Sequence, residues 1–98
     1  MERDAVIDAI RRNAPELRRR GVDALYLFGS TARGEAEPDS DFDIFIDRDP
    51  TTEYGVYHLW DLQAFLEDML KERVDLMKRS DLNPVIRSDV IEEAVRVL

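Results

Sequence analysis

Two aspartates lie two positions apart in the sequence, at Asp41 and Asp43. Side chains alternate between the two faces of a strand, so a strand here would direct both carboxylates to one side, with Phe42, Ile44 and Ile46 pointing the other way into a core. Two adjacent carboxylates repel each other, and a shared proton or a bound cation relieves that repulsion. Magnesium prefers oxygen ligands of this kind. The pair therefore predicts a cation site at one edge of a sheet.

The same pair also has an ordinary structural interpretation. Asp-x-Asp is common in acidic proteins, and Pro38, Asp39 and Ser40 just before it are typical of a polar turn. An EF-hand is excluded, because counting from Asp39 the sixth position is Ile44 instead of glycine and the twelfth is Pro50 instead of glutamate. Taken alone, the aspartate pair is more often structural than catalytic.

Gly29 and Ser30 form a second candidate, directly after an apolar run. Glycine allows a phosphate to approach the backbone, and the amides at a helix start can donate to an anion. Ser30 would add a hydroxyl donor, and Arg33 is one turn later. The alternative is that Ser30 is an ordinary helix N-cap and Gly34 an ordinary C-cap. A P-loop is excluded, since no Gly-Lys-Ser/Thr comes after Gly29.

Three short apolar segments predict the strands that would hold these residues, at 24–28, 42–47 and 74–77. The first is a continuous apolar run between Gly21 and Gly29. Such a run is typical of a strand buried on both faces, with helices covering each side.

Helical periodicity predicts the remaining elements. Residues 4–20 carry an apolar stripe that Pro15 should distort or restart, and residues 57–71 carry a stronger one. A last helix is expected from Pro84 to about Ala94, with 95–98 after it as helix or strand. Helices alternating with short strands predict one domain, residues 1–98, with an α/β (α+β) fold whose small mixed sheet is flanked by helices.

Two side chains of the 57–71 helix are considered as site residues and set aside. His58 is expected on an exposed or half-exposed side of the helix. Trp60 is expected in the core or at an interface. Neither is assigned to the chemistry.

Composition limits the classes of function. The 98 residues carry a net charge of −8, which disfavours direct nucleic-acid binding and suits a cationic partner or recruited divalent cations. There are no cysteines, so disulfides and thiolate metal sites are excluded. No apolar stretch is long enough for a membrane span or a signal peptide, and a cytoplasmic location is expected.

The spacing of the two candidates carries more information than either one. Ten residues separate Ser30 from Asp41, giving Gly-Ser-x10-Asp-x-Asp, which resembles the signature of the polymerase-beta-type nucleotidyltransferase superfamily. The strings from Leu27 to Gly34 and from Asp39 to Ile44 resemble its minimal nucleotidyltransferase (MNT) branch. The likeness continues through 59–70 to Val74-Asp75-Leu76, so it spans most of the chain and implies the nucleotidyltransferase fold.

The resemblance implies a role for each matching residue. Asp41 and Asp43 would bind Mg²⁺, two ions in all, bridging the phosphates of ATP. Asp75 would complete the carboxylate set as a third catalytic and metal-binding residue and help to activate the acceptor hydroxyl. Gly29 and Ser30 would hold the β- and γ-phosphates.

Arg33 and Asp75 have competing interpretations. Arg33 belongs to the nucleotide-binding motif, either as a direct contact to the nucleotide or as a motif residue without one. Asp75 at a strand start could instead cap the strand or pair with Arg73 or Lys78.

MNT proteins of this size resemble the antitoxin halves of two-gene modules whose toxin is a HEPN-domain ribonuclease. The family then implies transfer of AMP from ATP to a tyrosine of the toxin, within a hetero-oligomer. One alternative is an antitoxin that inhibits the toxin by binding alone. A less favoured alternative is nucleotidyl transfer to a small molecule or a nucleic-acid end.

Overall fold

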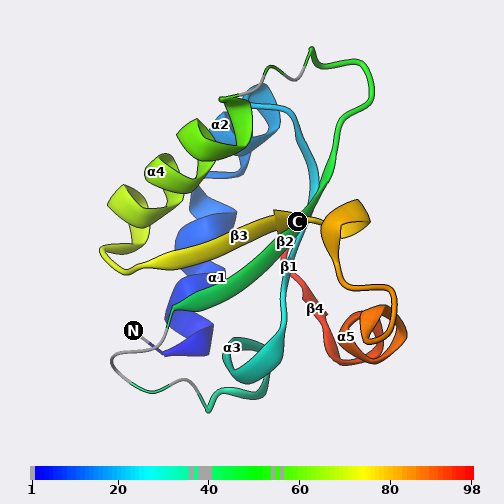
Figure 1. Ribbon diagram of the computed structural model, residues 1–98. Coiled ribbons are helices and arrows are strands. Elements are labelled where there is room, and N and C mark those ends of the chain that lie inside the picture. Colours follow the sequence, from blue (N-terminus) through cyan, green and yellow to red (C-terminus); the bar gives the residue numbers. More distant parts are fainter. Residues whose placement is uncertain (1, 36, 38–40, 54, 56) are drawn as a thin grey trace.

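A mixed four-stranded sheet forms the centre of the protein (Figure 1), seen in a computed structural model that describes residues 2–35, 37, 41–53, 55 and 57–98. Its strands are β1 (Val22–Leu27), β2 (Phe42–Arg48), β3 (Val74–Lys78) and β4 (Val95–Arg96), in the order β3-β2-β1-β4. β1 is antiparallel to both neighbours, whereas β2 and β3 are parallel. The predicted α/β fold with a small mixed sheet is confirmed.

Five α-helices and one short 3₁₀ helix surround the sheet in the described part of the chain. They are α1 (Arg3–Arg12), α2 (Ala14–Arg19), α3 (Gly29–Arg33), α4 (His58–Leu70), η1 (Arg79–Asp81) and α5 (Arg87–Glu93). In Figure 1, α1, α2 and α4 lie together on one side of the sheet, and α5 lies beyond β4. Helix α4 is the crossover that allows β2 and β3 to run parallel.

One face of β2 enters the main hydrophobic core, as its alternation predicts. Phe42 is 4% exposed, and Ile44 and Ile46 are fully buried. They pack in one cluster with apolar residues of the helices, namely Val6, Ile10, Leu17, Leu62, Leu66 and Leu70. Burying one such side chain stabilises the fold by roughly 1.5–3 kcal/mol. This core fixes β2, so the opposite face of β2 is fixed as well.

The opposite face of β2 is covered differently. Phe45 is fully buried, stacked on Tyr26 with ring centroids 4.7 Å apart and tilted against Phe28 at 5.7 Å. The Arg79 guanidinium lies 5.0 Å from the Tyr26 centroid and 5.2 Å from that of Phe45. The sequence predicts helices on both faces of β1. At Tyr26 this prediction is wrong, because the side chain packs against the Phe45 ring and the Arg79 guanidinium instead of a helix.

The helix predicted over 4–20 is interrupted at Asn13, as Pro15 suggests. The Asn13 side chain donates to the Ala9 carbonyl at 2.8 Å, and Pro15 then lies in the first turn of α2, where proline needs no hydrogen-bond acceptor.

The predicted start of the last helix at Pro84 is wrong, because α5 begins at Arg87. The Val85 amide donates to Asn83 Oδ1 at 3.0 Å and the Ile86 amide donates to the Asn83 carbonyl at 3.1 Å. These bonds close a turn that delays the helix. Near the chain end, residues 95–96 form strand β4.

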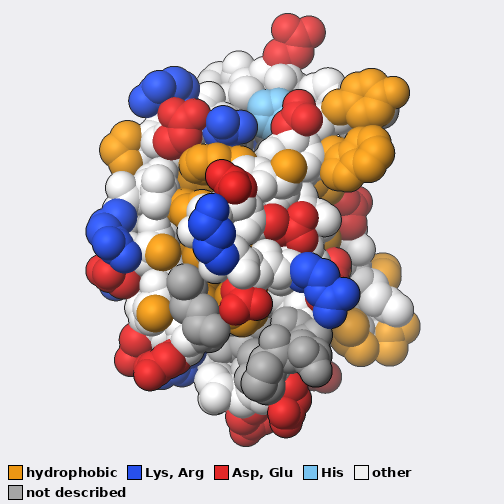
Figure 2. Space-filling view, turned by 90° about the vertical axis from the view of Figure 1, so that its left-hand side faces the viewer, with side chains coloured by type: hydrophobic (Ala, Val, Ile, Leu, Met, Phe, Trp, Pro, Cys, Tyr) orange, Lys and Arg blue, Asp and Glu red, His pale blue; other side chains and the backbone are white. Residues whose placement is uncertain are grey.

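Trp60 is not a core residue, since 69% of it is exposed, and Tyr57 is 66% exposed with its ring stacked on Trp60 at 6.2 Å between centroids. Figure 2 shows hydrophobic side chains gathered at the upper right of a face where acidic and basic side chains otherwise intermingle. The sequence predicts that Trp60 lies in the core or at an interface. Its exposure excludes the core, and a role at an interface stays a prediction. Among the described residues, no helix has the length and apolar character to cross a bilayer.

Candidate active site

The parallel pairing of β2 and β3 places two of the predicted carboxylates side by side. Asp43 on β2 is in register with Asp75 on β3, and neighbouring strands lie roughly 4.8 Å apart. Asp43 shares its strand face with Phe45, opposite the main core. Asp43 is half-buried and Asp75 exposed. The sheet therefore brings Asp43 and Asp75 together.

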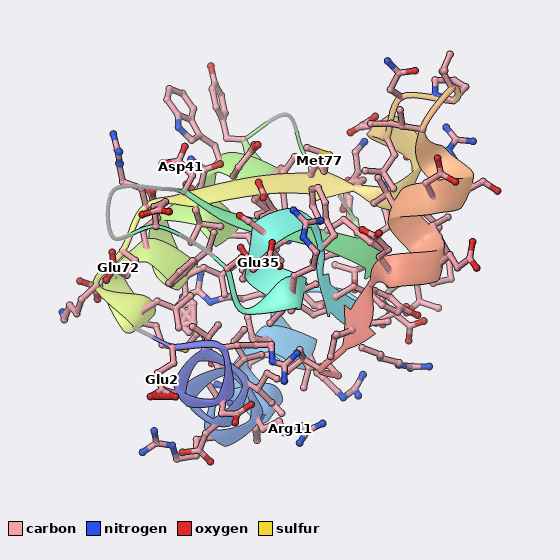
Figure 3. All side chains as sticks on the ribbon, turned by 90° about the horizontal axis from the view of Figure 1, so that it is seen from below. Glu2, Arg11, Glu35, Asp41, Glu72 and Met77 are labelled. Carbon is pink, nitrogen blue, oxygen red and sulfur yellow. The ribbon has the colours of Figure 1, made fainter. Side chains whose placement is uncertain are left out.

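Asp41 precedes β2 and is held less firmly. Its Oδ1 lies 3.2 Å from Nε of Arg73, the residue just before β3, and both side chains are largely exposed. Figure 3 shows Asp41 and Glu72 at the end of the sheet where β3 begins, with Met77 farther along that strand. An exposed ion pair of this kind is worth about 0–1 kcal/mol, so Asp41 can exchange Arg73 for another cation.

The carboxyl of Asp43 has an unfavourable surrounding for negative charge. Burial raises its pKa above the ordinary value of 3.8, the charges of Asp75 and Asp41 raise it further, and the charge of Arg33 opposes them. A cation at this end of the sheet would reverse the sign of that effect. The electrostatics thus agree with a carboxylate site that needs positive charge.

Gly29 lies directly beside Asp43, in a position that has no room for a side chain. Its φ of +59° favours glycine, and a Cβ built there would lie 2.7 Å from Oδ2 of Asp43. Any larger residue would collide with the carboxylate. Gly29 therefore keeps the space in front of Asp43 open, as expected for a loop that phosphates approach.

Thr31 joins α3, the short helix that begins at Gly29, to β2. The spacing of the motif does not indicate this role. Its Oγ1 accepts a hydrogen bond from the Asp43 amide at 3.0 Å, while the Phe28 amide donates to the Asp43 carbonyl at 3.0 Å. Thr31 is 2% exposed and is the buried polar residue of the described part of the chain. A buried hydroxyl inside the motif is the signal that could have singled it out.

Ser30 is not the helix N-cap, because Phe28 occupies that position and Ser30 lies inside α3. Gly34 is the C-cap, as the alternative interpretation held, with φ +72° and its amide donating to the Thr31 carbonyl at 3.2 Å. Ser30 is therefore left available for a role other than capping.

Arg33 is directed towards other carboxylates. Its Nε lies 3.0 Å from Glu35 Oε2 and its Nη1 lies 3.3 Å from Glu93 Oε2 on α5. These bonds tie α3 to α5, which makes Arg33 a link between helices in this arrangement.

The other predicted motif residues Pro38, Asp39 and Ser40 lie outside the described residues.

The two competing partners predicted for Asp75 each have a contact with another carboxylate. Arg73 lies on Asp41, and Nζ of Lys78 lies 3.7 Å from Oδ2 of Asp81. The place of Asp75 in the site and its predicted alternatives, capping the strand or pairing with Arg73 or Lys78, stay predictions.

Magnesium fits the donor chemistry of this end of the sheet. Carboxylate oxygens are its preferred protein ligands, burial and the neighbouring Asp75 and Asp41 raise the pKa of Asp43, and Gly29 adds no side chain beside Oδ2. Within the described ranges, no three His, Cys, Asp or Glu side chains already lie close enough to hold a metal. Asp41 would have to leave Arg73 to join Asp43 and Asp75.

Comparison with known sequences identifies relatives over nearly the whole chain. Residues 7–97 match the family model of the nucleotidyltransferase domain. Protein adenylyltransferase MntA of Thermococcus cleftensis is 41% identical over 83 residues, covering 84% of this chain and 82% of that protein. A Methanocaldococcus jannaschii protein assigned as a protein adenylyltransferase is 33% identical over 92 residues, covering 90% and 92%.

Solved structures give the same result for the fold. One assigned as a minimal nucleotidyltransferase matches with a TM-score of 0.80 and 32% identity, covering 97% of this chain and 95% of that chain. A toxin–antitoxin complex with AMP-PNP matches at 0.67 and 23%, covering 100% and 73%. A complex of tri-AMPylated Shewanella oneidensis HEPN toxin with MNT antitoxin matches at 0.64 and 20%, covering 94% and 71%. The last two show a shared fold.

Proposed function

The chain belongs to the nucleotidyltransferase domain family, with protein adenylyltransferases among its relatives, and we propose that it is an antitoxin that transfers AMP from ATP to a tyrosine of a HEPN-domain toxin. The observation that carries the proposal is the in-register pair Asp43 and Asp75, with Gly29 contributing no side chain beside Asp43. Carboxylates and an open backbone are what nucleotidyl transfer requires, since it depends on positioning and charge neutralisation.

Each residue of the site has a defined task in this proposal. Gly29 and Ser30 would hold the phosphates of ATP, and Asp41, Asp43 and Asp75 would hold two magnesium ions. Those ions supply neutralisation of the phosphate charge when bound. Asp75 accepts the proton of the tyrosine hydroxyl, whose oxygen forms a bond to the α-phosphorus. The bond from that phosphorus to the β-phosphate oxygen breaks, and pyrophosphate leaves.

The choice of acceptor rests on the relatives and on charge. The Thermococcus relative is a protein adenylyltransferase, and the Shewanella complex pairs an AMPylated HEPN toxin with a chain of the same fold. A net charge of −8 suits a basic partner protein. ATP as donor agrees with the AMP-PNP in the other toxin–antitoxin complex.

The direct test uses ATP labelled at the α-phosphate, Mg²⁺ and a HEPN protein encoded beside this chain. We expect the label on a tyrosine of that protein, and its loss with Asp43→Asn. Asp8→Asn is the matched control, because Asp8 is an exposed residue paired with Arg12 on α1. Labelling that persists with Asp43→Asn would sink the assigned mechanism.

A second candidate is neutralisation by binding alone. The stacked and exposed pair Tyr57 and Trp60 favours a protein-contact surface that does not depend on catalysis. If Asp43→Asn abolishes the label but cells remain protected from the toxin, binding is the dominant mode. If protection disappears with the label, transfer is.

A further inference from the structure

A cleft lies at the opposite ends of the two strands that carry Asp43 and Asp75. Its volume is about 480 Å³, and its lining residues are Ile46, Asp47, Arg48, Lys78, Arg79, Ser80 and Arg87. Asp47 is four positions after Asp43 in the sequence, which is about 13 Å along a parallel strand. The cleft is therefore separate from the carboxylate end of the sheet.

The lining of the cleft has the opposite charge from the whole protein. Four of its seven residues are cationic and one is a carboxylate, although the chain carries a net charge of −8. The cations come from the ends of β2 and β3, from η1, and from the start of α5. The fold thus gathers positive charge from positions up to 39 residues apart, Arg48 to Arg87, into one concave surface.

One of these cations forms a fixed wall. Arg79 binds Asp47 through two nitrogens, with Nε at 2.7 Å and Nη2 at 3.0 Å, and its guanidinium lies over the rings of Tyr26 and Phe45. This arrangement neutralises the single carboxylate of the lining. Asp47 is thereby used by Arg79, and the printed contacts of Lys78 and Arg87 are with residues other than Asp47.

Lys78 and Arg87 have hydrogen-bonding capacity left for a ligand. The Lys78 ammonium has a long contact of 3.7 Å with Asp81. Arg87 donates through Nη2 to the carbonyls of Leu82 at 3.0 Å and Ser80 at 3.3 Å, while its Nε is buried without a hydrogen-bond partner. A buried unpaired donor is costly, and a bound acceptor is a common explanation for one.

We propose that this cleft is a second binding site, for a small phosphate-bearing anion. Phosphate oxygens match both a guanidinium donor at Arg87 and the ammonium of Lys78. The volume falls within the roughly 300–1,000 Å³ range of small-molecule pockets, so it admits an anion as large as a nucleotide. The site binds the anion but catalyses no reaction, since its one carboxylate is held by Arg79.

The test titrates the ¹⁵N-labelled full chain with pyrophosphate, and separately with orthophosphate and AMP, in EDTA. Without divalent cations the carboxylate end repels anions, so binding there is suppressed. We expect saturable amide shifts at Ser80 and Arg87 and unchanged shifts at Gly29. Tight binding of AMP would identify a nucleoside phosphate as the ligand, and preference for pyrophosphate would identify a free phosphate.

Variants decide whether the cleft is responsible. Lys78→Gln and Arg87→Gln should each weaken binding about tenfold, the scale of one charge-assisted hydrogen bond. Arg12→Gln, an exposed change of equal charge on α1, should leave affinity unchanged. Because Arg87 also holds the Leu82 carbonyl, Lys78→Gln provides the independent variant. Absence of saturable binding, equal weakening with Arg12→Gln, or shifts at Gly29 would each overturn the proposal.

Discussion

The two ends of the parallel pair β2 and β3 contain similar residues in opposite electrostatic states. Asp43 and Asp47 project from the same face of β2, four residues apart. Asp47 is bound by two nitrogens of Arg79, at 2.7 and 3.0 Å. At Asp43, by contrast, burial raises the pKa of the carboxyl, and the charges of Asp75 and Asp41 raise it further. The comparison separates a structural carboxylate from a site carboxylate on a single strand.

The difference arises from the groups that the fold places beside each carboxylate. Beyond the end of β3, Arg79 of η1 reaches back over the aromatic rings to Asp47. Beside Asp43 lies Gly29, which contributes no side chain at all. A cation supplied by the fold makes Asp47 part of the structure. The space left by Gly29 beside Asp43 instead supports our proposal that Asp43 binds a cation from solution.

Exchanging the two carboxylates for amides should produce opposite results. Asp43→Asn should lower nucleotidyl transfer by at least about a hundredfold, the scale on which loss of one transition-state charge partner acts. Asp47→Asn should leave transfer in place and lower the free energy of unfolding by about 1–3 kcal/mol, because the half-buried Arg79 loses its partner. Transfer assays and urea unfolding on both variants measure this. Equal loss of transfer in both would contradict the distinction between the two ends.

Gly29→Ala should damage the site and the fold together. The left-handed backbone alone costs a non-glycine residue about 1–2 kcal/mol, and the added Cβ would lie 2.7 Å from Asp43. Gly34→Ala is the matched control, since Gly34 has φ +72° but nothing within 4 Å of an added Cβ. We expect similar backbone destabilisation in both variants, measured by urea unfolding, and loss of transfer in Gly29→Ala alone. Full transfer activity in Gly29→Ala would show that the contact with Asp43 is unimportant.

Thr31→Val tests the connection between the glycine turn and Asp43 by removing the acceptor for the Asp43 amide without changing the size of the side chain. A buried donor left unpaired costs about 1–3 kcal/mol, so the free energy of unfolding should fall by that amount. Thr31→Ser retains the hydroxyl and should recover most of the loss in a urea titration. If valine and serine behave alike, the hydrogen bond does not hold the turn.

The carboxylate end was more predictable from the sequence than the other end for a physical reason. Gly29 and Asp43 belong to one fifteen-residue motif, and its resemblance to a known family predicts the turn and strand that place these two residues side by side. The three predicted strands and the helix over 57–71 were confirmed, since periodicity is a local property.

Features that depend on distant contacts were not predictable. Asp47 and Arg79 are 32 residues apart, and the strand register that brings β2 beside β3 decides that they meet. The role of Thr31 requires α3 to pack against β2. The delayed start of α5 has a different cause, a local bond from the Val85 amide to the Asn83 side chain that competes with the helix start. Neither the contact of Asp47 with Arg79 nor that of Thr31 with Asp43 produces a periodic pattern or a characteristic spacing in the sequence. Assignment of Asp41, Asp75, Ser30 and Arg33 to the site stays a prediction.

The smallest expected effect concerns the pH dependence of stability. Because folding raises the pKa of Asp43 above its ordinary value of 3.8, the folded chain binds more protons than the unfolded chain in that range. Stability contributed by this group is present below the ordinary pKa and is lost as pH rises through the raised pKa. In EDTA, Asp43→Asn should therefore gain stability relative to the wild type as pH increases from about 4 towards neutrality.

Magnesium should cancel that gain, since a cation near Asp43 favours the ionised carboxylate that asparagine cannot provide. Thermal unfolding of both proteins across this pH range, with EDTA and then with Mg²⁺, measures the difference. Asp47→Asn serves as the contrast, because Arg79 already supplies its positive charge and magnesium should not alter its deficit. If magnesium stabilises the wild type and Asp43→Asn equally, the ion binds away from this carboxylate, and the distinction between the two strand ends would have to rest on Gly29 alone.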